Sequence, residues 1–576
     1  MAQAVLFFCP YESVQKRRML SDLESQRTIS QKCVPLPKFN RKTMEKNEGK
    51  KLFTASEEMK EEYCAKIVRI GEMKEIEGSD FLVQTFVDGF SIVVSKGQFT
   101  VGEPVIYCMN ETALNKDFLA ANNQFELSLA EMNANADEVL KLKEEGNIDE
   151  AKKLVGFFNK HGRVKLIKLR GCPSYGCIFK KDSLVKWKKK LANENLEDYF
   201  TIDENGIEHP FSFDTIAGEL FAEAYVPPIQ FPKTKREIRR EKGIKRFKRI
   251  IPGEFLLHYD TAQLQSSLWR FEPSTKVTIS VKLHGTSVIV ANVLTRIPVQ
   301  ITSAEQWFNR KVKKEIKQIG KSRVNPYWGK TKQEKRSKTL ADKQIADFKI
   351  GYGPVFSSRT VIKNQFDSKY GGFTAGHYGQ DIWTEYGNLI FKHLDKGMTL
   401  YGEICGYLTQ SDSMIQGGYD YRCDHGKNFL MPYRITVKLE NGTKEEWNVQ
   451  KIHNWTVRLM NEHPEISDRL KPIPILYHGS IAELYPDIPN DASWGMNFLD
   501  HLANDVEHFG MEKNEPFCKN KVPREGICIR IDDDPVAECF KLKTFAFLKK
   551  EQLEMDAGNV NIEMRDAYAA DSDNLN

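Results

Sequence analysis

Val281-Lys282-Leu283-His284-Gly285-Thr286-Ser287 is the stretch of this 576-residue chain that most constrains its fold and its chemistry. The β-branched run from Val277 to Val281 predicts a strand that leads into it, and Gly285 predicts a turn directly afterwards. Lys282 is therefore expected at the end of a strand, with its amine facing a pocket.

Four further short strings follow this stretch in order along the chain. They are Ser358-Arg359, Tyr401-Gly402-Glu403-Ile404-Cys405-Gly406, Arg524-Glu525-Gly526-Ile527 and Lys541-Leu542-Lys543. A lone Lys-x-His-Gly string would carry little information. The ordered set predicts a lysine that attacks a nucleotide, flanked by groups that hold the phosphates and the ribose.

A nucleophilic lysine needs an unusual environment, because an ordinary lysine amine is protonated at neutral pH. Burial or neighbouring cations would lower the pKa of Lys282, and Lys541 and Lys543 are the candidate cations. Two residues apart on a strand, they point to the same side, so both are also suited to contact one phosphate. Without the other strings, Lys282 would be interpreted as a surface lysine.

Two carboxylates lie beside apolar strand residues and need a partner there. Glu403 and Glu525 suit a ribose hydroxyl or a hydrated Mg²⁺ ion, and the alternative is a pair of buried salt bridges with lysine or arginine. Arg359 is suited to forked contacts with a phosphate. Tyr433 offers a face for adenine or, alternatively, is a core residue.

The eleven cysteines include no Cys-x-x-Cys pair, which favours reduced thiols over a disulfide framework. Cys172 with Cys177, and Cys423 with His425, have spacings that do not match the usual zinc motifs.

No run approaches 18 apolar residues, so a membrane span is not expected. The first ten residues lack a basic leader and a cleavage site. We expect a soluble, intracellular monomer, cytoplasmic if the source is a bacterium or a phage.

Positive charge is concentrated in two segments although the formal net charge is only +5. Residues 233–249 contain ten Lys or Arg, and residues 310–343 form a second basic stretch that includes Tyr327 and Trp328. Basic segments with interleaved aromatics suit a polyanion, whereas most charge runs are solvated helices or loops. A nucleotide site in the same chain favours nucleic acid as the partner.

The length predicts two to four domains. We expect an extension at 1–60, a small β domain at 61–224, a basic linker at 225–250, a larger α/β region at 251–563 and a tail at 564–576. Strands in the small domain are predicted at 65–70, 81–87, 90–94, 105–107, 164–169 and 177–179, with a hairpin turn at Asp88-Gly89 and a helical insertion at 127–158. This pattern favours an oligonucleotide-binding (OB) barrel over another small β domain. The larger region has predicted strands at 277–281, 287–293, 400–404, 434–439 and 527–531 and helices at 447–461 and 494–509.

The strings together resemble the covalent nucleotidyltransferase superfamily of ligases and capping enzymes. Within it, the chain is similar to RNA ligases of the Deinococcus/Naegleria type over residues 65–563. Besides the strings above, the resemblance includes His258-Tyr259-Asp260-Thr261, residues 358–364, residues 415–421, Val87-Asp88-Gly89-Phe90 and Leu169-Arg170-Gly171. It implies an α+β fold, with an OB-like barrel followed by an ATP-grasp-like ligase domain of antiparallel sheets and helices.

The same resemblance implies an ATP-dependent RNA ligase active in nick or RNA repair. Lys282 would form a lysyl-AMP, pass AMP to an RNA 5′-phosphate, and a 3′-hydroxyl would then displace AMP. Partners would be ATP, Mg²⁺ or Mn²⁺, and RNA, including nicked duplexes and RNA–DNA hybrids. Glu403 and Glu525 would hold the metal, largely through water. The implied ATP-binding residues are Lys282, His284, Gly285, Arg359, Glu403, Tyr433, Glu525, Lys541 and Lys543.

Two positions depart from the family pattern. Val281 stands where many members have an acidic residue, and His284 stands where other branches have Asp, which argues against a metal-binding role for His284.

Two alternative functions would use the same sequence features. A GTP-dependent capping enzyme or a DNA ligase normally has a further domain, and 33 residues follow Lys543. A non-catalytic RNA-binding protein with a ligase-like fold would not need all of the charged site residues.

Overall fold

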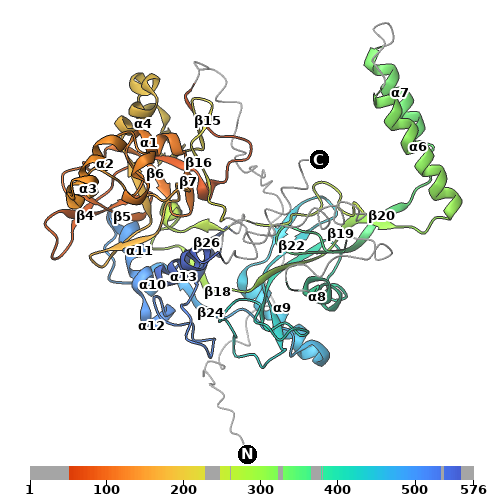
Figure 1. Ribbon diagram of the computed structural model, residues 1–576. Coiled ribbons are helices and arrows are strands. Elements are labelled where there is room, and N and C mark those ends of the chain that lie inside the picture. The colour runs from red at the N-terminus through yellow and green to blue at the C-terminus, as the bar shows by residue number, and fades with distance from the viewer. Residues whose placement is uncertain are drawn as a thin grey trace, which may run out of the picture. The chain divides into compact units, whose positions relative to one another are not determined.

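Two five-stranded sheets carry the predicted site residues, and the stretch from Lys282 to Gly285 connects them (Figure 1). The computed structural model describes residues 51–227, 247–259, 261–321, 329–364, 378, 380–532 and 538–558. The first sheet runs β17 (Ala262–Gln263), β26 (Cys539–Lys543), β25 (Gly526–Ile531), β18 (Lys276–Lys282), β24 (Ile475–Ser480). The second runs β20 (Phe348–Ser357), β19 (Thr286–Pro298), β21 (Met398–Gly406), β22 (Asn428–Lys438), β23 (Lys444–Glu446).

Both sheets are antiparallel apart from the short β17–β26 pair. Val277, Ile279 and Val281 of β18 are at most 1% exposed, because this β-branched strand lies between β25 and β24 and is covered on both faces. Burial of each such side chain contributes about 1.5–3 kcal/mol. The strand that ends in Lys282 is therefore firmly held.

Helices cover these sheets through two apolar clusters. Residues of α8 (Ile382–Phe391) and α9 (Val449–Glu462) pack with β19, β21 and β22, and residues of α11 (Trp494–Asn504) and α12 (Val506–Phe509) pack with β18 and β25. Among the described residues, the other helices of this region are α6 (Ser303–Lys321), α7 (Gly329–Ala341), α10 (Ile481–Leu484), α13 (Phe545–Asp556) and the 3₁₀ turns η5 (Gln265–Arg270) and η7 (Pro464–Ile466).

Most predicted elements of the larger region are present with shifted ends. The predicted helix at 494–509 is wrong in one respect, because Asp505 is extended and its side chain accepts the His508 N–H at 2.8 Å, which ends α11 and starts α12. The predicted helix at 447–461 begins at Val449, after the cap residue Asn448. The predicted strand at 434–439 is the second half of the longer β22.

Residues 52–225 form a region of short strands and helices. Its elements are β1 (Phe53–Thr54), η1 (Glu61–Tyr63), β2 (Ala65–Arg69), β3 (Met73–Glu75), β4 (Leu82–Val87), β5 (Phe90–Ser95), β6 (Pro104–Met109), β7 (Thr112–Leu114), α1 (Lys116–Ala121), η2 (Leu127–Met132), α2 (Ala136–Glu144), α3 (Ile148–Lys153), β8 (Ile167–Leu169), β9 (Cys172–Ser174), β10 (Gly176–Phe179), α4 (Lys181–Trp187), η3 (Lys189–Asn193), η4 (Leu196–Tyr199), β11 (Thr201–Ile202), β12 (Glu208–His209), β13 (Phe211–Phe213), β14 (Thr215–Ile216), β15 (Glu219–Leu220) and β16 (Ala222–Ala224).

The predicted turn and insertion are confirmed in this region. Asp88 and Gly89 both have positive φ, as a two-residue hairpin requires, and α2 and α3 lie within the predicted insertion. The predicted strand at 164–169 is wrong in its first half. Val164 and Leu166 are buried outside the strand, and the Leu166 N–H donates to the side chain of Gln552 instead of to a neighbouring strand.

The β pairings among these described residues form open sheets of two to four strands. The larger ones are β10–β6–β2–β13, β3–β4–β5 and β1–β14–β15. The OB-like barrel is therefore not confirmed and stays a prediction, as do the proposed domain boundaries. The compact unit that contains nearly all of the described residues begins at Leu52. The basic linker lies mostly, and the 564–576 tail wholly, outside the described residues.

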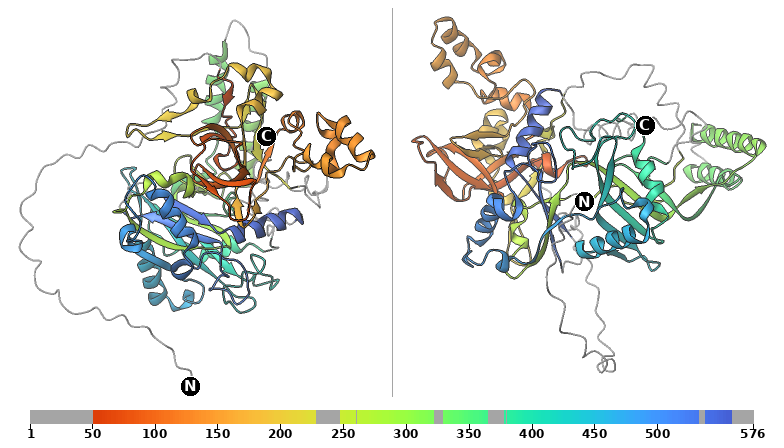
Figure 2. Two further views of the ribbon diagram at one scale, coloured as in Figure 1. Left: turned by 90° about the vertical axis from the view of Figure 1, so that its left-hand side faces the viewer. Right: turned by 90° about the horizontal axis from the view of Figure 1, so that it is seen from below.

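The second basic stretch falls on α6 and α7, which are inserted between β19 and β20. Figures 1 and 2 show the two helices side by side. Within the described residues, none of the helices is long and apolar enough to cross a membrane.

Candidate active site

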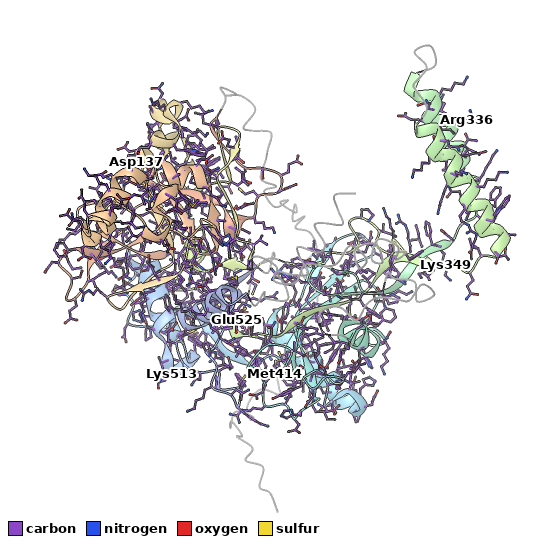
Figure 3. The ribbon with its side chains drawn as sticks, in the orientation of Figure 1. Asp137, Arg336, Lys349, Met414, Lys513 and Glu525 are labelled. Carbon is purple, nitrogen blue, oxygen red and sulfur yellow. The ribbon has the colours of Figure 1, made fainter. Side chains whose placement is uncertain are left out.

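Lys282 and Glu525 form an ion pair where two neighbouring strands meet. Lys282 is the last residue of β18 and lies opposite Gly526, the first residue of β25, so Glu525 is next to it. Lys282 Nζ is 2.8 Å from Glu525 Oε1, and the Glu525 side chain is only 4% exposed. Figure 3 labels Glu525 in the whole molecule. The strand-end position predicted for Lys282 is confirmed.

The charge state of Lys282 differs from the prediction. Burial lowers the pKa of Lys282, but the nearby Glu525 carboxylate, together with Cys528 and Glu403, outweighs burial and raises the pKa overall. The prediction that burial and the charges of Lys541 and Lys543 lower the pKa of Lys282 overall is therefore wrong. Burial raises the pKa of the Glu525 carboxyl, but the charges of Lys282 and Lys543 outweigh burial and hold this pKa low. The amine and the carboxylate are both charged.

Lys541 and Lys543 lie on the same side of β26, as predicted from their spacing. Lys543 Nζ is 3.5 Å from Glu525 Oε1 and 3.1 Å from Glu551 Oε2 of α13. Lys541 is ion-paired with Glu62 of η1. Burial, together with the charges of Lys543 and Lys282, lowers the pKa of Lys541 overall, although Glu62 acts to raise it. Lys282, Lys541 and Lys543 thus lie among three acidic groups, Glu525, Glu551 and Glu62.

The turn after Lys282 is held by hydrogen bonds from another part of the chain. The His284 N–H donates to the Tyr421 hydroxyl at 2.6 Å, and the Gln416 amide donates to the Gly285 carbonyl at 2.6 Å. The His284 ring packs edge-on against Tyr419 and Phe547 and lies 3.5 Å from Glu525. A Cβ at residue 285 would lie 2.3 Å from the Ile404 carbonyl oxygen, so glycine is required there.

Glu403 and Tyr433 come from the second sheet. Glu403 Oε1 accepts the Gly285 N–H at 3.0 Å and thereby ties β21 to the turn. Ser287 lies opposite Glu403, and its hydroxyl is 3.4 Å from the Tyr433 hydroxyl. A bulge between Tyr401 and Gly402 leaves Tyr433 as the extra residue of β22. Bulges of this kind redirect a side chain at functional sites.

Arg359 follows β20, in the turn that starts at Ser358. Burial raises the pKa of the Glu62 carboxyl, but Lys541, Lys543 and Arg359 together lower it overall. Arg359 is thus electrostatically linked to the two lysines through Glu62. The structure connects Lys282, His284, Gly285, Glu403, Glu525 and Lys543 by direct contacts, and Lys541, Arg359 and Tyr433 through an intermediate residue.

Two sets of residues at the site were not predicted from the sequence. Glu62 is 479 residues from Lys541, and no local pattern marks it. Gln416, Tyr419 and Tyr421 lie in the 415–421 segment, which was noted only as a feature of the resemblance, whereas the structure gives it the role of supporting the turn.

The paired carboxylates suit a particular kind of metal ion. Mg²⁺ keeps several waters and takes one or two carboxylates together with substrate phosphates. Glu403 and Glu525 both contact the Lys282–Gly285 stretch, so they fit a hydrated divalent cation that also contacts a bound polyphosphate. A site made of protein ligands alone would need more donors.

No protein-family model matches the chain, and no curated protein matches it. The similar solved structures include a mutant of a Naegleria gruberi RNA ligase with ATP and Mn, at 14% identity and a TM-score of 0.45, covering 85% of this chain and 99% of that one. The same ligase with PPi shows 13% identity and a TM-score of 0.44, covering 86% and 99%. Because the identity and the TM-score are both low, a function can be assigned only from the residues of this chain.

Proposed function

We propose that this protein is an ATP-dependent RNA ligase that joins a 3′-hydroxyl RNA end to a 5′-phosphate end. The observation that carries the proposal is the Lys282–Glu525 pair at 2.8 Å, next to a strand that presents Lys541 and Lys543 on one side. A lysine amine beside clustered cations and a carboxylate pair is suited to attack a phosphate that is held by those cations.

Three displacements at phosphorus make up the proposed reaction. Lys282 Nζ forms a bond to the α-phosphorus of ATP, pyrophosphate leaves, and the amine loses a proton. An oxygen of the RNA 5′-phosphate then attacks the same phosphorus and releases the lysine. Finally, the RNA 3′-hydroxyl attacks the 5′-phosphate, forms the phosphodiester bond and releases AMP.

Lys282 has to lose its proton before the first displacement. The nearby carboxylates oppose this loss, because they raise the pKa of the amine. A divalent cation bound near Glu403 and Glu525 would offset their charge and stabilise the charge that develops on the phosphates. Lys541, Lys543 and Arg359 would hold phosphate oxygens.

The nucleoside is expected on the side of the second sheet. Tyr433, placed by the bulge in β22, would stack on adenine, and Glu403 would bind a ribose hydroxyl or a metal-bound water. The triphosphate and Glu62 would compete for Lys541, since both are anionic. ATP binding would therefore displace the ion pair between Lys541 and Glu62.

The inserted helix pair is suited to hold RNA. Helices α6 and α7 contain eleven Lys or Arg and three Glu. Trp307 is 60% exposed, with Lys311 Nζ 5.5 Å from its ring centre. An exposed aromatic ring among cations fits the stacked bases and phosphates of a nucleic acid. Replacing the exposed Lys311 and Lys335 with Glu should weaken RNA binding and flatten its salt dependence, and unchanged binding would contradict this role.

Incubation with labelled ATP or GTP, followed by acid denaturation, tests the proposed activity. We expect label on the protein from ATP and none on Lys282→Ala, and sealing of a nicked RNA duplex that depends on Mg²⁺ or Mn²⁺. Label from GTP alone would indicate a capping enzyme. Absence of label from both nucleotides would indicate a non-catalytic RNA-binding protein.

A further inference from the structure

A second cluster of metal-ligating residues lies outside the nucleotide site. It consists of His393, His463 and Glu465, whose ligand atoms all lie within 4.8 Å of one another. Among the described residues, it is the one group of three or more His, Cys, Asp or Glu side chains close enough to hold a metal ion. The cysteines considered from the sequence belong to no such group there.

The backbone places the three residues at the ends of two helices. His393 lies two residues after the end of α8, and its N–H donates to the Ile390 carbonyl at 2.9 Å. His463 ends α9, with its N–H bonded to the Leu459 carbonyl at 3.0 Å. Pro464 then starts the 3₁₀ turn η7, which contains Glu465. Backbone hydrogen bonds therefore hold the chain where each of the three side chains starts.

The spacing of two of the donors matches a tetrahedral metal site. His463 Nδ1 is 3.4 Å from Glu465 Oε1. Two atoms bound at about 2.0–2.1 Å to one tetrahedral Zn²⁺ lie about 3.3–3.4 Å apart. The His393 and His463 rings are 4.2 Å apart between centres, and the ligand atoms of all three residues lie within 4.8 Å of one another.

An orphaned nitrogen independently points to a ligand. His393 Nε2 is buried and has no hydrogen-bond partner among the described residues. A buried polar atom without a partner typically costs about 1–3 kcal/mol.

We propose that His393, His463 and Glu465 bind one Zn²⁺ ion, with water in the fourth position. The ion would link the end of α8 to the end of α9, two helices that pack in the same apolar cluster over the second sheet. Lys392 Nζ lies 3.8 Å from Glu465 Oε1 and competes with the metal for this carboxylate. The site is separate from the proposed nucleotide chemistry, so the two proposals can fail independently.

The test uses the full chain without a histidine tag, stripped with a chelator and titrated with Zn²⁺ against a chromophoric competitor. We expect a one-to-one site, loss of at least about tenfold in affinity for His393→Asn and for His463→Asn, and no loss for the control His453→Asn in α9. Lys392→Met should bind Zn²⁺ more tightly, and weaker binding would exclude Glu465 as the third ligand.

Two further readouts separate loss of the site from loss of the fold. Co²⁺ should give the visible absorption of a tetrahedral site in the wild type and not in His463→Asn. Zn²⁺ should raise the thermal midpoint of the wild type, while wild type and His463→Asn should unfold at the same temperature in chelator. Equal Zn²⁺ affinity in the wild type and both ligand variants, or no binding to the wild type, would overturn the proposal.

Discussion

Replacing both members of the Lys282–Glu525 pair should destabilise the protein by less than the sum of the two single replacements. Breaking a buried ion pair from one side typically costs about 3–5 kcal/mol. After Lys282→Met, Glu525 would keep Lys543 and His284, each at 3.5 Å, so we expect about 3 kcal/mol, the lower end of that range. Glu525→Gln should cost a similar amount, since Lys282 and Lys543 would lose their shared counter-charge.

The double variant isolates the interaction. Because Lys282→Met with Glu525→Gln leaves no unpaired carboxylate, we expect its cost to fall short of the sum of the single costs by about 2 kcal/mol. Urea unfolding at pH 7 measures all four proteins. The matched control is Lys451 with Glu445, which are 2.9 Å apart but both 49% exposed, and whose coupling should stay below about 1 kcal/mol. Additive costs for Lys282 and Glu525, within about 0.5 kcal/mol, would refute the reasoning.

Three further outcomes follow from the electrostatics of the site. Because the pKa of Lys282 is raised, the fraction of neutral amine is small at pH 7 and grows as the pH rises. Single-turnover adduct formation should therefore accelerate between pH 7 and 9. A flat pH profile would contradict this. Lys541→Ala and Lys543→Ala should each slow adduct formation by about 10²–10³-fold, whereas removing two lysines from residues 233–249 should mainly weaken RNA binding in a salt-dependent way. Glu62→Gln should speed adduct formation at low ATP, and slower formation would show that Glu62 positions Lys541 rather than blocks it.

Local patterns predicted the framework of the site well. The β-branched run before Lys282, the glycine after it and the two-residue spacing of Lys541 and Lys543 each have a direct physical meaning, and the structure agrees with all three. The pKa direction of Lys282 could not be predicted in the same way. It depends on the alignment of β18 with β25, which places a carboxylate oxygen 2.8 Å from the amine.

Contacts between distant segments were beyond sequence reasoning. His393 and His463 are 70 residues apart and share no motif, and their proximity results from the way α8 and α9 pack over one sheet. The break at Asp505 is an intermediate case. Asp is a good helix-capping residue, but the apolar periodicity on both sides of it favoured a single helix.

The α6–α7 pair is also a separable module in the architecture of the chain. Strands β19 and β20 stay paired up to Pro298 and Phe348. The insertion therefore leaves the sheet after Pro298 and returns to it at Phe348, the residue directly opposite. A short turn would replace it without changing the register of any strand that carries a site residue. The RNA affinity proposed for this segment can therefore be tested, by its deletion or exchange, independently of the geometry around Lys282.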